Sequence, residues 1–187
     1  MLFLCEIIVA QGVVNSEKLF TSDVDKFSLI FSPSIDLQKG NSDVLESGIQ
    51  LSSLYKLNSK HWIKLSAGLD IIREDSENVS NDQFCQIRHT YTLNNWSHTF
   101  LFYQLQSNFN LGVTKRELIG TGVRFKPIKT NKFKYDFGLG IMHEIEEYQI
   151  DIENSNMFRI TSMSIMKLMF ENFELKNITY YQPSFCL

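Results

Sequence analysis

Apolar and polar residues alternate along most of the chain from Phe27 onward. Between Phe27 and Leu37 nearly every second residue is apolar, whereas serine, aspartate and glutamine occupy most of the positions between them. Because side chains of an extended chain point alternately to its two sides, a period of two predicts a β-strand with one apolar and one polar face. Pro33 has no N–H to donate to a neighbouring strand, so we expect this strand at an edge of its sheet or with a bulge.

The same alternation predicts eight more strands, which makes nine in total. It is clearest in Leu45–Leu57 and Ile63–Ile71. Further segments show it less regularly: Gln83–Leu93, His98–Gln106, Glu117–Phe125, Phe133–His143, Phe158–Met169 and Phe173–Tyr181. No apolar run reaches the roughly 18 residues of a transmembrane helix, but a strand of about 9–11 residues is long enough to cross a bilayer.

The predicted connections alternate between short and long. The short ones are rich in asparagine and serine: Asn58–Lys60, Asn94–Ser97, Pro127–Thr130 and Glu171–Asn172. The long ones are polar: Glu74–Asp82, Ser107–Arg116 and Glu144–Asn156, with Lys39–Asp43 intermediate. This alternation is typical of outer-membrane barrels, which have short periplasmic turns and long external loops.

The composition of the polar face helps to decide whether the apolar face meets lipid or fills the interior of a soluble barrel, since both classes share the period of two. The polar face is mostly small or uncharged residues, which suit a crowded interior. It also holds six glycines: Gly48, Gly68, Gly120, Gly122, Gly138 and Gly140. We interpret them as residues that relieve crowding inside a narrow barrel, and bulges in a soluble sheet are the alternative. Trp62 and Trp96 flank strand ends, where we expect them at a membrane interface.

The polar face carries a few charged residues that we predict to face the barrel lumen, where they pair in a plugged interior or line a small pore. They are Lys64, Asp70, Arg88, Arg124 and Asp136. No Ser-His-Asp order, glycine-rich phosphate loop or pair of catalytic carboxylates occurs, and the four histidines are scattered. We therefore predict no catalytic, cofactor-binding or metal-binding residue and do not expect an enzyme.

Two predicted long loops are acidic, and we interpret them as solvated segments, with cation binding at a cell surface as the alternative. Their acidic residues are Asp75, Glu77 and Asp82 in one loop and Glu144, Glu146, Glu147, Asp151 and Glu153 in the other.

Composition indicates one compact domain, with 187 residues of which 43% are hydrophobic. The formal charge of -3 and the absence of a basic stripe give no reason to expect a nucleic-acid partner. Cys5, Cys85 and Cys186 show no metal-site spacing, so we interpret them as packing residues. Residues 1–12 resemble the remnant of a secretory signal peptide, with a short buried strand as the alternative, and residues 13–187 form the predicted barrel domain.

Several segments resemble domain-of-unknown-function family 481, the YdiY-like proteins described as salt-induced outer-membrane proteins. The resemblance runs from about Val14 to Pro183 and is carried by Val14–Leu19, Leu37–Asp43, Gly120–Val123 and Phe137–Glu144. It implies an outer-membrane barrel of undefined function and supplies no catalytic residue. The chain ends shortly after a segment that resembles the family's Thr-Tyr-Tyr-Gln-Pro, and an odd strand count does not suit a bacterial barrel. We therefore expect a reading frame that lacks the last strands.

These observations predict an all-β, antiparallel up-and-down transmembrane β-barrel in the outer membrane of a Gram-negative bacterium. The expected role is envelope structure or response to osmotic or salt stress, with a small channel as one form of it. The expected partners are outer-membrane lipids and the barrel-assembly machinery during insertion, and the oligomeric state is left open. A soluble secreted or periplasmic barrel that binds a small apolar ligand is the second hypothesis, and a membrane-embedded enzyme is a remote third.

Overall fold

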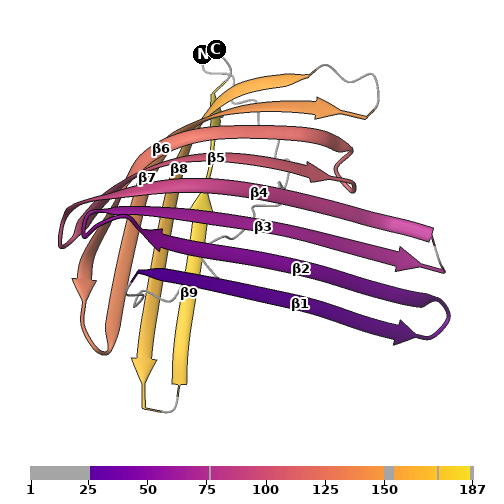
Figure 1. The fold of residues 1–187 in the computed structure, drawn as a ribbon, viewed down its shortest axis with the longest axis horizontal. Coiled ribbons are helices and arrows are strands. Elements are labelled where there is room, and N and C mark those ends of the chain that lie inside the picture. The colour runs from indigo at the N-terminus through magenta and orange to yellow at the C-terminus, as the bar shows by residue number, and fades with distance from the viewer. Residues whose placement is uncertain (1–25, 76, 150–153, 172, 186–187) are drawn as a thin grey trace, which may run out of the picture.

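The fold is all-β in the computed structural model, which describes residues 26–75, 77–149, 154–171 and 173–185. The strands are β1 Phe27–Lys39, β2 Asp43–Lys56, β3 His61–Glu74, β4 Glu77–Asn94, β5 Ser97–Asn108, β6 Val113–Lys129, β7 Phe133–Tyr148, β8 Ser155–Phe170, β9 Phe173–Tyr181 and β10 Ser184–Phe185 (Figure 1). The nine predicted strands are thereby confirmed, although most are longer than predicted. The described residues include no helix capable of crossing a membrane. The predicted signal remnant, residues 1–12, lies outside the described residues.

The strands form one antiparallel meander in which each strand from β1 to β8 pairs with the next, and β9 and β10 both pair with β8. Figure 1 shows that the sheet curls strongly, so that β8 and β9 run steeply across the direction of β1 to β4. β1 lies at the edge, as Pro33 predicts, and Pro33 faces Ile49 without a register shift. Within the described residues no pairing joins β1 to β9 or β10, so the sheet is open there.

The two faces of the sheet have opposite polarity. The concave inner face carries most of the buried polar side chains of the described residues, among them Lys64, Gln86, Arg116 and Glu144. The outer face carries large apolar side chains that remain exposed along every long strand. Examples are Leu29, Leu51, Leu65, Ile87, Leu101, Ile119, Leu139 and Ile160. This is the reverse of a soluble sheet, which buries its apolar face against a core.

The prediction of long loops is wrong, because the strands continue through most of the residues that we assign to those loops. The connections that we predict to be long or intermediate span only residues 40–42, 75–76, 109–112 and 149–154. Connection length therefore does not alternate along the chain. Charged residues that resemble loop residues in the sequence are paired across strands instead. Arg116 on β6, for example, lies opposite Glu146 on β7 and bonds to it.

Three of the six glycines on the inner face make room for aromatic rings, which refines the prediction that they relieve crowding. In the described strands the inner-face phenylalanines each lie opposite a glycine: Phe84 and Gly68, Phe100 and Gly122, Phe102 and Gly120. A Cβ atom on Gly120 would lie 2.6 Å from the Phe102 ring and 2.8 Å from Cβ of Met142. A larger residue at position 120 therefore requires the ring or the neighbouring strand to move.

Candidate functional site

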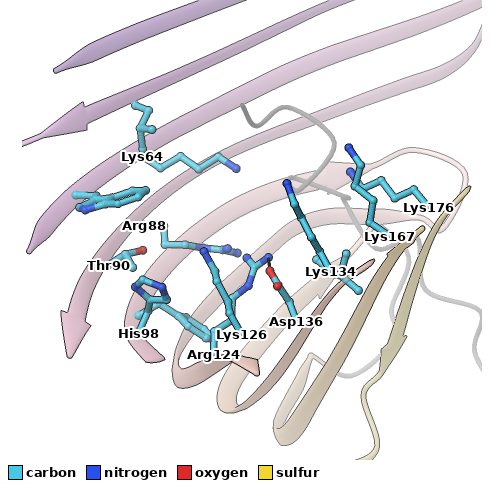
Figure 2. Close-up of a pocket in the computed structure, with 14 residues that line it drawn as sticks. Lys64, Arg88, Thr90, His98, Arg124, Lys126, Lys134, Asp136, Lys167 and Lys176 are labelled. Carbon is cyan, nitrogen blue, oxygen red and sulfur yellow. Dashed lines mark hydrogen bonds and ion pairs between the residues drawn. The ribbon is translucent and has the colours of Figure 1, made fainter. Parts of the chain in front are cut away.

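A cavity of about 300 Å³ lies on the inner face near the turns that join β2 to β3, β4 to β5, β6 to β7 and β8 to β9. We call it the basic cavity. Among the described residues that line it, seven are cationic and only Asp136 is a carboxylate. The cationic residues are Lys64, Arg88, Arg124, Lys126, Lys134, Lys167 and Lys176. Figure 2 shows them entering the same space from different strands.

The structure brings four of the five predicted lumen-facing residues to this cavity: Lys64, Arg88, Arg124 and Asp136. Asp70, the fifth, lies further along β3 toward the opposite end of the sheet and does not line the cavity. In the register of β2 and β3 it faces Gly48, and it shares its side of β3 with Lys64.

The lining of the cavity includes a close ion pair and an arginine that lies over two aromatic rings. Arg124 Nη2 donates to Asp136 Oδ2 at 2.6 Å, the pair joined by a dashed line in Figure 2. The guanidinium of Arg88 lies over the rings of Phe100 and Phe102, at 5.4 and 5.8 Å from their centroids. These contacts fix the two guanidinium groups, because a planar cation is attracted both to a carboxylate and to the face of an aromatic ring.

Four lysines lie in direct register on four neighbouring strands, and three of them line the cavity. We call Lys129, Lys134, Lys167 and Lys176 the lysine row, since each lies opposite the next on β6, β7, β8 and β9. Within the described residues the one carboxylate partner of the row is Glu174, which lies 2.9 Å from Lys167 Nζ. The expectation that no basic stripe exists is therefore wrong on the inner face. The sequence hides the row because its members come from four separate strands.

Trp62 corrects the interpretation of both tryptophans as membrane-interface residues. Trp62 faces inward and lines the basic cavity, and Lys56 Nζ lies 5.3 Å from its ring centroid. Trp96 is exposed in the turn between β4 and β5 and stacks on Phe125 with centroids 5.7 Å apart. Only Trp96 therefore has the exposed position that an interfacial ring requires.

A second group of charges lies on the inner face toward the opposite end of the sheet. This buried ion cluster consists of Arg116, Glu144, Glu146, Arg159 and Tyr148. Arg159 Nε donates to Glu144 Oε2 at 2.7 Å, Arg116 bonds to Glu146, and the Tyr148 hydroxyl donates to Glu146 Oε2 at 2.5 Å. The prediction that Glu144 and Glu146 belong to a solvated acidic loop is therefore wrong.

The outer face brings together two residues that the sequence separates. His61 Nδ1 lies 3.0 Å from His89 Nε2, and the two rings stack. Cys85 lies exposed on the same face and is not the packing residue that we predict from the sequence. The described residues contain no group of three or more side chains arranged to hold a metal ion.

Comparisons with known proteins find one family and one distant solved structure. The family model described as "Protein of unknown function, DUF481" matches residues 33–185. No curated protein matches the chain. A solved structure described as "KdgM porin" is 12% identical, covers 84% of this chain and 93% of its own, and has a TM-score of 0.37. A likeness that weak carries no argument about this chain.

Proposed function

The chain belongs to the DUF481 family of proteins of unknown function, and from that premise we propose that it is a β-barrel protein of a Gram-negative outer membrane. The proposal assigns its apolar outer face to lipid and its polar inner face to the barrel interior. The observation that carries it is the reversed polarity of the sheet.

The outer face is too apolar for water. Leu65, Leu101 and Ile119 are each about half exposed, at 49%, 52% and 51%, and they lie on three different strands. Full burial of one such side chain stabilises a fold by about 1.5–3 kcal/mol relative to leaving it in water. A surface that faces water would lose this stabilisation at every one of these positions. A band of these residues across the sheet is instead the surface that acyl chains solvate.

The inner face is too polar for the interior of a soluble barrel. Lys64 is 3% exposed and Glu144 is 1% exposed, and both lie on the concave side. The second hypothesis, a soluble barrel that binds a small apolar ligand, requires the apolar face on that side. The observed arrangement therefore favours the membrane barrel.

In this proposal the partners are outer-membrane lipids and, during insertion, the barrel-assembly machinery. The role is structural or a response to osmotic or salt stress, with the basic cavity forming part of a small channel. The proposal includes no enzymatic step, because it assigns the charged side chains of the inner face to ion pairs and to the lining of the cavity.

Fractionation of cells that express the full chain tests the proposal. We expect the protein in the outer-membrane fraction, with a faster electrophoretic band before heating than after, as folded barrels show in detergent. A soluble, detergent-free monomer would refute the membrane assignment. Stepwise conductance across a planar bilayer would support the channel form, and its absence would leave the structural role.

A further inference from the structure

We propose that the basic cavity binds a multivalent oxyanion, a small solute that carries several phosphate or carboxylate groups. This inference rests on the proposed function in one respect, since it takes the polar face as the barrel interior. It adds a ligand class and the residues that select it.

The lysine row is the first observation. Like charges directly opposite each other on neighbouring strands destabilise a sheet. Lys134, Lys167 and Lys176 lie in such register on three strands and all line the cavity. Among the described residues Lys134 and Lys176 have no carboxylate partner, and Glu174 pairs with Lys167 alone. An anion in the cavity would neutralise this row.

The contrast between the two ends of the sheet is the second observation. In the buried ion cluster Glu144 and Glu146 accept from Arg159 and Arg116, so opposite charges are matched across strands. Side chains of this sheet thus neutralise one another where both signs are present. The basic cavity has an excess of positive charge among its described residues, with Asp136 as the one lining carboxylate.

The chemistry of the donors indicates oxyanions with several charged groups. Guanidinium groups bind phosphate and carboxylate through paired N–H donors, and lysine ammonium groups add mobile point charges. Thr90 and His98 line the same cavity and add polar side chains. The volume of about 300 Å³ is at the lower end of the range for small-molecule sites. Cations on opposite sides suit an extended anion better than a single monovalent ion (Figure 2).

Trp62 provides a reporter for the test. The chain has two tryptophans, so a Trp96→Phe variant leaves the indole that lines the cavity as the sole one. We would fold the full chain in detergent micelles and titrate sodium tripolyphosphate, then citrate, maltotriose and spermine. We expect a saturable change in Trp62 emission with tripolyphosphate, and saturation by citrate as well would extend the site to carboxylates. No saturation by either anion, or equal saturation by spermine or maltotriose, would overturn the proposal.

Substitutions then locate the site. Lys134→Gln with Lys176→Gln should weaken tripolyphosphate binding by about tenfold for each lysine removed. Lys134→Arg with Lys176→Arg keeps both positive charges and should retain the binding. Because the glutamines relieve like-charge repulsion, the variant should fold. Lys60→Gln with Lys132→Gln removes the same charge from exposed turns at the same end of the sheet and should change affinity little. Equal affinity in the two double variants would overturn the assignment.

The band shift on heating is recorded for the same samples. Its absence in the parent protein would refute the barrel, whereas the emission titration alone decides the anion site. The two proposals can therefore fail separately.

Discussion

Replacement of Glu144 by alanine should strongly destabilise the folded protein. The carboxylate is 1% exposed, accepts from Arg159 Nε at 2.7 Å and lies 3.4 Å from Arg116 Nε. Its removal leaves the Arg159 guanidinium, which is 10% exposed, without this ion pair. Removing one partner of a buried ion pair costs about 3–5 kcal/mol, because the remaining charge stays desolvated.

The assay is urea unfolding in detergent micelles, followed by tryptophan emission and by the heat-dependent band shift. With a slope of about 1–3 kcal/mol per molar urea, the expected loss lowers the midpoint by at least about 1 M. Glu147 is the matched control, because it lies on the outer face of the same strand with a side chain 49% exposed and 3.9 Å from Lys115 Nζ. Glu147→Ala should change stability by no more than about 0.5 kcal/mol.

A double variant separates charge from packing. Glu144→Met with Arg159→Met removes both charges and should recover most of the lost stability, since an apolar pair of similar volume often replaces a buried ion pair at little cost. If Glu144→Ala and Glu147→Ala unfolded at the same urea concentration, the buried ion cluster would contribute nothing and the reasoning would fail.

Three further predictions follow from the two faces of the sheet. Gly120→Val should destabilise the folded protein by about 1–3 kcal/mol in urea unfolding, because the valine side chain meets Phe102 and Met142. Gly40→Val should be neutral, because Gly40 has open space around it. Leu139→Arg, midway along the outward apolar side of β7, should cost about 2–4 kcal/mol in lipid vesicles, and a change within about 0.5 kcal/mol would argue for an aqueous surface. Asp136→Asn removes the one carboxylate among the described lining residues of the basic cavity and should raise tripolyphosphate affinity by about tenfold in the Trp62 titration. Unchanged or lower affinity would count against anion binding in this cavity.

Strand identity was predictable from the sequence because it depends on a local period of two. The ends of the strands were not predictable in this way. The positions that the pattern assigns to loops are polar because their side chains pair with neighbouring strands on the inner face. Arg116 and Glu146 are 30 residues apart and become partners only when β6 and β7 align. A polar inward side chain near a strand end has the same local signature as a loop residue.

The candidate site was predictable only in part for the same reason. Lys64, Arg88, Arg124 and Asp136 stand out because each interrupts a face of small residues, and all four line the cavity. Lys167 and Lys176 belong to strands with weaker alternation, and their alignment depends on the register of β8 and β9. Register is set by pairing over the whole strand, so a single sequence segment does not reveal it.

The assignment of the two faces is tested most directly by fluorescent labels on opposite sides of the sheet. A bimane label on Cys85, with Cys5→Ser and Cys186→Ser, reports from the outer face, and the same label on a Lys134→Cys, Cys85→Ser variant of that background reports from the basic cavity. In vesicles we predict that brominated acyl chains quench the label at position 85 and that aqueous iodide quenches the label at position 134. Quenching of the position 85 label by iodide and not by brominated lipid would contradict the membrane barrel.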